Sequence, residues 1–178
     1  MALNPQVIGT SMPHGYAGCY ARQPDMIVNT RPAGGTDPIT FGTALKYDAN
    51  KNVVPFAGSG TTAAEFVGVA ASEIKSSLSY LEPSNGQFAP GEAVGVFMRG
   101  SINVKCWKGK PAIGGTVYVR IAETSAYAET TVVGGFEAEA DSTTAENVVA
   151  LDADVCQWGG PADANGVAEL IILKRPMA

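Results

Sequence analysis

The chain has 178 residues, of which 46% are hydrophobic and 16% are charged, and its net charge is −5. This length suits one domain, or one domain with an extension, and can bury a core without disulfide or metal support. The acidic balance and the absence of a Lys/Arg run exclude a general nucleic-acid binder, which needs a basic stripe. The abundance of Gly (21) and Pro (11) favours short strands and turns over long helices.

The residues that usually report cofactors, export or membranes are sparse. Cys19, Cys106 and Cys156 are odd in number and form no C-x-x-C pair, so we expect no disulfide framework and a reducing place of synthesis. One histidine, His14, cannot build a His-based zinc site, and we expect neither a metal nor another cofactor. The first basic residue is Arg22, and no apolar run is long enough to span a bilayer. The sequence therefore predicts no export signal and no membrane contact.

Residues 1–62 are predicted to form an extended, Pro-rich N-terminal arm. Proline fixes φ and removes a backbone donor, so we expect no long paired strands in this region. The arm still carries spaced apolar residues, namely Ile8, Tyr16, Tyr20, Met26, Ile27, Val28, Phe41 and Leu45. Two interpretations stay open: the arm lies on the surface of another protein, or it packs on its own domain.

Residues 63–178 are predicted to form a small antiparallel β-barrel or sandwich. The stretch "EFVGVA", residues 65–70, is apolar and β-like. Residues 72–82 are ambiguous, because Ile74, Leu78 and Leu81 fit one face of a helix while alternate residues fit one face of a strand. The sequence leaves that choice open.

The segment from Gly91 to Pro111, "GEAVGVFMRGSINVKCWKGKP", is the most regular part of the chain. We predict two strands, 93–98 and 101–107, joined by a turn at Arg99-Gly100. In the second strand Ile102, Val104 and Cys106 are expected to point inward. Ser101, Asn103 and Lys105 are expected to point to solvent, as in a half-buried antiparallel strand.

The later strands continue this pattern. In "TVYVRIA", Val117, Val119 and Ile121 are expected to face inward, with Tyr118 and Arg120 outward. "FEAEA", "NVVAL", "VCQW" and "VAELIIL" complete the set. Residues 170–173 are apolar on both faces, which indicates either a central strand or contact with a partner. Short strands at this spacing predict an all-β fold.

No catalytic constellation is predicted. "GSGTTA" at residues 58–63 has dinucleotide-like spacing but lacks the strand–helix context, so we interpret it as a turn. Glu137, Glu139 and Asp141 alternate on one strand face, and carboxylates two residues apart lie about 7 Å from each other. Without aromatic neighbours they are expected to form a solvated acidic face.

The two tryptophans carry an alternative. Trp107 and Trp158 are expected to pack in the core or at an interface, although exposed aromatic rings also stack on sugars. The alternative function is therefore a carbohydrate-binding or glycan-hydrolysing domain that uses either tryptophan with Glu137 and Glu139.

Several stretches together resemble a known family. "FVGVA", "IKSSLSYLEPSNGQFAPGEAVGVFMRGSINVKCWKGKPAIGGTVYVRIA" and "CQWGGPADANGVAELIIL" resemble the structural cement (head decoration) proteins of tailed bacteriophages, Gp24-like group. The resemblance runs from about Phe66 to Leu173 and is most specific at "PGEAVGVFMRGSINV" and "GPADANGVAELIIL". The N-terminal "PHGYAGCYARQPDMIVNT" is also similar.

This resemblance implies a β-rich protein, synthesised in the host cytoplasm, that sits on the outer capsid surface, bridges major capsid proteins and resists internal DNA pressure. The implied partners are the major capsid protein and other copies of the chain, as a dimer or trimer, with no nucleic acid and no catalytic residues. A tail or baseplate subunit is the alternative among virion proteins. The expected capsid or subunit contacts are Tyr16, Tyr20, Met26, Ile27, Phe41, Trp107, Trp158, Leu170 and Ile172.

Overall fold

The computed structural model describes residues 13–72, 86–124 and 130–174, and most of the region left ambiguous between helix and strand, 73–82, lies outside them. The described residues form short strands and two single-turn 3-10 helices, with no α-helix, so the predicted all-β class is confirmed. The strands are β1 (Tyr20–Pro32), β2 (Ile39–Thr40), β3 (Ala44–Tyr47), β4 (Val53–Pro55), β5 (Gly68–Ala70), β6 (Gln87–Phe88), β7 (Ala93–Lys105), β8 (Tyr118–Arg120), β9 (Phe136–Glu137), β10 (Val148–Ala150), β11 (Cys156–Trp158) and β12 (Val167–Ile172). The 3-10 helices are η1 (Ala63–Glu65) and η2 (Ala145–Asn147).

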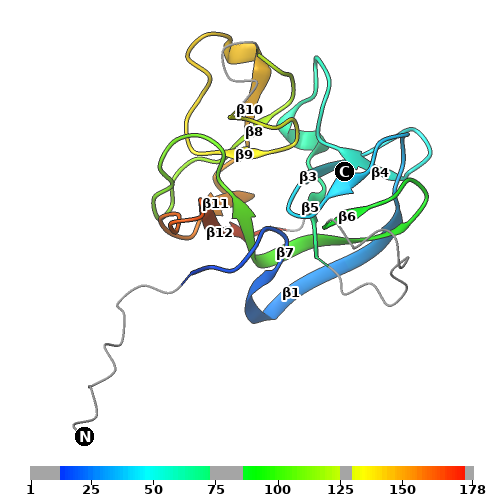
Figure 1. Cartoon of the computed structure of the whole chain (residues 1–178), viewed down its shortest axis with the longest axis horizontal. Helices are drawn as coiled ribbons and strands as arrows, with labels where there is room; N and C mark the ends of the chain where they lie inside the picture. Colours follow the sequence, from blue (N-terminus) through cyan, green and yellow to red (C-terminus); the bar gives the residue numbers. More distant parts are fainter. Residues whose placement is uncertain (1–12, 73–85, 125–129, 175–178) are drawn as a thin grey trace, which may run out of the picture.

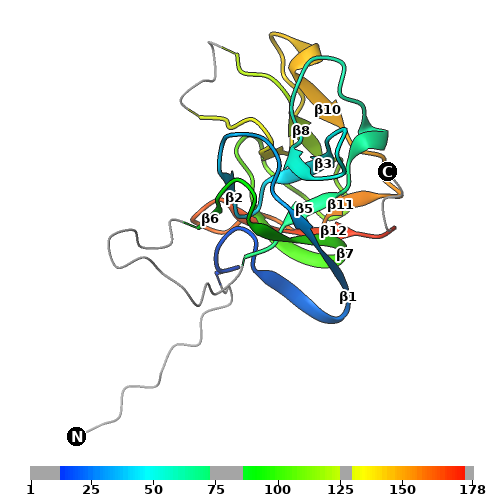
Figure 2. The ribbon, with the colours of Figure 1, turned by 90° about the vertical axis from the view of Figure 1, so that its right-hand side faces the viewer.

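The described residues form three antiparallel sheets. The largest has seven strands in the order β11-β12-β7-β5-β3-β4, with β1 also paired to β7. A three-stranded sheet has the order β10-β8-β9, and β2 pairs with β6. The three-stranded sheet lies on the side of the molecule opposite β1 (Figures 1 and 2). The sheets do not close into a barrel, so the arrangement is an open, sandwich-like packing of sheets.

The predicted hairpin within Gly91–Pro111 is wrong, because β7 is one continuous strand of 13 residues. β1 pairs with β7 from Ala93 to Ile102, while β5 and then β12 pair with the two halves of its opposite edge. The predicted half-burial is also wrong, since Ser101 and Asn103 are buried as well. A strand covered on both faces and paired on both edges shows no simple alternation of polar and apolar residues.

Gly100 allows β7 to continue where the sequence suggested a turn. Its φ is +105°, and a Cβ at this position would lie 2.2 Å from the carbonyl oxygen of Asp25 in β1. Register shifts in the β1–β7 ladder flank this point. The alternation of side chains between the two faces shifts at this irregularity. Phe97 and Ile102 are five residues apart, which in a regular strand would place them on opposite faces, yet both belong to the same core.

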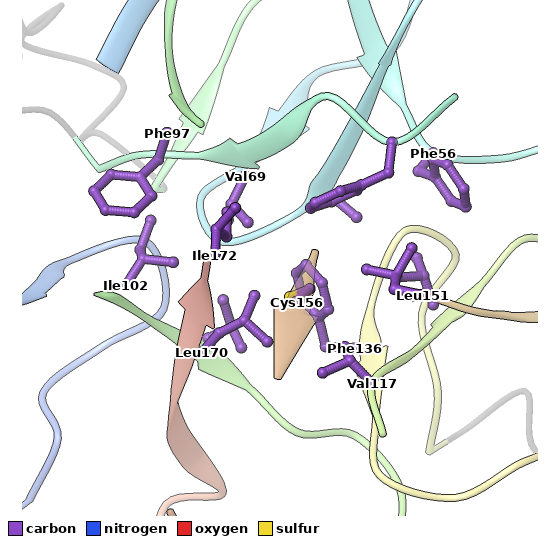
Figure 3. Packing of buried hydrophobic residues seen from close by; sticks show 14 of the residues in the cluster. Phe56, Val69, Phe97, Ile102, Val117, Phe136, Leu151, Cys156, Leu170 and Ile172 are labelled. Atoms are coloured by element: carbon purple, nitrogen blue, oxygen red, sulfur yellow. The ribbon is translucent and has the colours of Figure 1, made fainter. Parts of the chain in front are cut away.

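Two hydrophobic cores flank β7. One core gathers Phe97, Ile102 and Val104 with residues of β12 and of the three-stranded sheet. Figure 3 shows Val117, which precedes β8, and Phe136 of β9 facing the cluster around Leu170, Cys156 and Ile172 of the seven-stranded sheet. The other core contains Val94, Val96 and Met98 from the opposite face of β7, together with Leu45, Val53 and Phe88.

The N-terminal region contributes to these sheets, contrary to the expectation that it holds no long paired strands. β1 has 13 residues, and β3 and β4 belong to the large sheet. The predicted boundary between residues 62 and 63 runs through one sheet, because β3 lies before it and its partner β5 after it. Prolines are tolerated here because Pro32 ends β1 and Pro24 lies where the ladder is irregular.

Replacing Gly100 with alanine is expected to destabilise the protein by more than the same replacement at Gly91. Both glycines have positive φ, but a Cβ at Gly91 would meet nothing within 4 Å. Gly91→Ala should cost about 1 kcal/mol of backbone strain, whereas Gly100→Ala adds a steric clash with β1. Urea unfolding of both variants measures the difference, and equal losses would contradict this role for Gly100.

Candidate functional site

The residues expected to contact a capsid or another subunit divide into three groups. Tyr16 and Tyr20 are exposed, with relative exposures of 60% and 38%. Met26, Ile27, Phe41 and Trp107 are half-buried. Trp158, Leu170 and Ile172 lie fully inside the first core. Of the two interpretations of residues 170–173, the structure selects the central strand, because β12 pairs with both β11 and β7.

Internal contacts hold most of the half-buried group. The ring of Phe41 packs edge-on against Phe88, with 5.0 Å between centroids. Met26 packs against the first core. The Nζ atom of Lys105 lies 3.9 Å from the centroid of the Trp107 ring, which is cation–π geometry. These side chains present only part of their surface to a partner.

Tyr16 lies on a loop, Pro13–Cys19, that polar contacts fix to β7; we call it the N-terminal loop. The backbone N–H of Gly18 donates to the carbonyl oxygen of Asn103 (2.7 Å), and the N–H of Asn103 donates to the carbonyl oxygen of Cys19 (2.9 Å). The Asn103 side chain donates to the carbonyl oxygen of His14 (2.6 Å). These bonds explain why Asn103 is buried, and they hold Tyr16 outward on a fixed backbone.

Two carboxylates hold the same region to the sheet. The guanidinium of Arg22 donates to both oxygens of Glu169 in β12, at 2.7 and 3.0 Å. Asp163 accepts the backbone N–H of His14 at 2.9 Å. The hydrogen bond from Arg22 lowers the pKa of the buried Glu169 carboxyl. For Asp163, burial favours the neutral form, but the N–H groups of His14, Val167 and Asn165 outweigh it and lower its pKa.

The predicted solvated acidic face is wrong, because two of its three carboxylates are buried around Arg120. Arg120 is fully buried, although strand alternation predicted that it points outward. Its Nε and Nη2 atoms donate to the two oxygens of Glu137, and its Nη1 donates to Asp141 at 2.9 Å. Only Glu139 is exposed.

Further hydrogen bonds complete this Arg120 cluster. Asp141 accepts the hydroxyl and backbone N–H of Thr143, at 2.7 and 2.9 Å. The Asn147 amide donates to the hydroxyl of Thr124 at 2.6 Å, and Thr124 contacts both Asp141 and Arg120. Burial alone would raise the pKa of Asp141, but the bonds from Thr143 and Arg120 lower it overall. A guanidinium whose hydrogen bonds are made in this way holds β8, β9 and the loop after β9 together.

Sequence reasoning missed this cluster because its members lie far apart along the chain. Arg120 is 17 residues from Glu137 and 21 from Asp141. An arginine inside an apolar strand, in a chain with few charges, was the one available signal.

The alternative glycan site does not assemble. Trp158 is 1% exposed, and Glu137 is fully buried in its pair with Arg120. His14 lies in the N-terminal loop, and "GSGTTA" includes the turn before η1, as expected. Within the described ranges no three His, Cys, Asp or Glu side chains gather to hold a metal, and no helix is long and apolar enough to cross a bilayer.

Removing the cation of the Arg120 cluster is expected to destabilise the protein strongly. Arg120→Met leaves two carboxylates buried without their guanidinium, which costs about 3–5 kcal/mol in comparable sites. Arg99→Met is the control, because Arg99 pairs with Asp25 at the surface and such pairs contribute less than about 1 kcal/mol. Denaturant unfolding measures the stability of both variants, and similar losses of stability would show that the Arg120 cluster does not hold these segments together.

Stability is expected to fall as the pH decreases below about 5. The pKa values of Asp141, Asp163 and Glu169 are lowered in the folded state, so their stabilising contribution is present above the unfolded-state pKa. It is lost as the pH falls towards the folded-state values. Glu169→Gln should reduce the free energy of unfolding near neutral pH, and should therefore make the loss of stability between neutral and acidic pH smaller. Asp37→Asn, at an exposed carboxylate, should change neither quantity. Unfolding curves across this pH range measure both variants. If Glu169→Gln loses as much stability on acidification as the unmodified protein, Glu169 does not contribute to the pH dependence.

Comparison with known proteins identifies the family. Residues 5–172 match the family model described as XM1 gp53 minor capsid protein. A chain of a solved structure titled "The capsid of Myoviridae Phage XM1" is similar in fold, with a TM-score of 0.63 and 16% sequence identity, over 99% of this chain and 100% of that chain. No curated protein matches. The chain therefore belongs to the XM1 gp53 minor capsid protein family, and it is a structural component of a phage capsid and not an enzyme.

Proposed function

We propose that this protein is a capsid cement protein, which binds the outside of the phage head and bridges neighbouring major capsid proteins. The observation that carries the proposal is the match to a minor capsid protein family over residues 5–172. A protein that binds only the assembled shell stabilises that shell by mass action, without any chemistry of its own.

The N-terminal loop and the start of β1 are the proposed capsid contact. Tyr16 is exposed on a backbone fixed by the bonds of Gly18 and Asn103, and the Tyr20 ring lies 5.6 Å from that of Phe97. Tyrosines on a fixed backbone lose little conformational entropy on binding and are frequent in the energetic centres of interfaces. Trp158, Leu170 and Ile172 leave the set of proposed contacts, because they are buried inside the chain.

The first experiment asks whether the protein stabilises heads and whether the tyrosines are needed. Heads assembled without the protein should disrupt at a lower temperature than heads to which it has been added, in proportion to occupancy. Tyr16→Ala with Tyr20→Ala should weaken attachment by at least about tenfold, which corresponds to about 1.4 kcal/mol. Co-sedimentation with empty heads measures attachment.

Ile113→Ser is the matched control. Ile113 is 82% exposed on a separate loop and is not among the proposed contacts. Loss of attachment in this variant, but not in the tyrosine variant, would place the contact elsewhere on the protein. Heads that disrupt at the same temperature with and without bound protein would contradict the cement role. Density for the protein on the tail, in electron micrographs of whole virions, would contradict the location.

A further inference from the structure

A pocket of about 370 Å³ lies where β1 departs from β7. From Arg22 to Ile27 β1 advances five residues, whereas their partners in β7, Ser101 and Arg99, are only two residues apart. The surplus residues make β1 bend away from β7, and Figure 2 shows this bend below β7 and β12. We call the hollow the β1 pocket, and its walls include Arg22, Pro24, Arg99, Ile171, Ile172 and Leu173.

The two arginines of the β1 pocket have hydrogen-bond donors to spare. The Nε and Nη2 atoms of Arg22 donate to Glu169 at 2.7 and 3.0 Å, and those of Arg99 donate to Asp25 at 3.4 Å. Within the described part of the chain, Nη1 of neither arginine makes a hydrogen bond. The Arg22 and Arg99 side chains are 74% and 43% exposed, so a ligand can reach these donors.

The carboxylates beside the β1 pocket are already engaged. Both oxygens of Glu169 accept from Arg22, and the Glu169 side chain is buried. Asp25 accepts from Arg99 at distances that are long for charged groups, and its side chain is largely exposed. Surface pairs of this kind are weak. A ligand that enters the pocket therefore meets unused cationic donors and one carboxylate that it can displace.

The rest of the wall is apolar. Pro24 comes from the bend of β1, while Ile171 and Leu173 come from the end of β12 and the residue that follows it. Leu173 is among the exposed large hydrophobic side chains. A carboxylate matches the planar fork of a guanidinium, and an aliphatic stem covers an apolar wall. An acidic side chain has both parts, whereas a hydrated inorganic anion leaves the apolar wall uncovered.

We propose that the β1 pocket binds an acidic side chain of the capsid shell through the unused donors of Arg22 and Arg99. The carboxylate of the shell takes the place of Asp25 beside Arg99, and its stem lies against Leu173. The β1 pocket adjoins the proposed capsid contact, because Arg22 follows Tyr20 by two residues in β1. The inference rests on the proposed cement function, and it adds the chemistry of the partner.

Attachment to empty heads tests the partner. Arg99→Met removes one of the two guanidinium groups, so it should weaken co-sedimentation with heads at least about tenfold. Asp25→Asn should strengthen attachment, because it neutralises the carboxylate that competes for Arg99. Added salt should weaken attachment of the unmodified protein more than that of Arg99→Met.

Arg31→Met is the matched control for Arg99→Met. Arg31 is exposed on the same strand, but it lies outside the β1 pocket, with its guanidinium carbon 5.9 Å from the centroid of the Tyr47 ring. Its replacement should leave attachment unchanged. Urea unfolding of each variant confirms that it is folded under the conditions of the assay.

A small carboxylate tests the β1 pocket without heads. Hexanoate carries a carboxylate on an aliphatic stem, and hexanamide is its neutral counterpart. In NMR titrations of the full chain, hexanoate should shift the backbone amide signals of Ser101 and Leu173 saturably, with a dissociation constant of about 10 mM. Hexanamide should not produce a saturable shift. Arg99→Met should remove the response to hexanoate, and Arg31→Met should retain it.

Two results would overturn the proposal. One is the absence of a saturable shift with hexanoate, or an equal response to hexanamide, because the pocket then does not select a carboxylate. The other is equal attachment of the unmodified protein, Arg99→Met and Asp25→Asn, because the shell then does not use the pocket. Failure of the unmodified protein to attach to heads would contradict the cement role itself, and that result is seen before any variant is compared.

Discussion

Along its 13 residues β7 pairs with β1 on one edge and with β5 and then β12 on the other. Its two faces supply residues to two different cores, so both cores and three neighbouring strands, β1, β5 and β12, depend on this strand. β7 can contribute to both cores because Gly100 lets the backbone of β1 pass close to it without interrupting the strand. A side chain at this position would force the two strands apart.

The chain buries several of its few charges, and each is paired. Arg120 is satisfied by Glu137 and Asp141, and Glu169 is paired with Arg22. Such clusters cost desolvation energy and add little net stability compared with apolar packing. Their directional bonds fix which segments lie together: the Arg120 cluster joins β8 to β9 and the loop that follows it, and Glu169 holds the start of β1 to β12. In a fold of short strands and small cores, contacts of this kind fix the relative positions of the strands.

A capsid component needs surfaces in place of a reactive centre. Of the two carboxylates of the glycan alternative, Glu137 is paired with Arg120, and of its two tryptophans, Trp158 is in the core. The surface retains two exposed tyrosines, Tyr16 in the N-terminal loop and Tyr20 at the start of β1.

Local patterns predicted the strand-rich class, the later strands and inward residues such as Val117 and Val119, because alternation along a short strand is a local property. It also indicated a phage head protein through the resemblance of residues 66–173. The tertiary structure was needed to show that Gly100 continues β7, that β1, β3 and β4 join the main sheet, and that Arg120 points inward. Each of these depends on a partner distant in sequence. A glycine bends or continues a strand according to what crosses it, prolines are tolerated where the ladder needs no donor, and a guanidinium is buried only where carboxylates from other segments meet it.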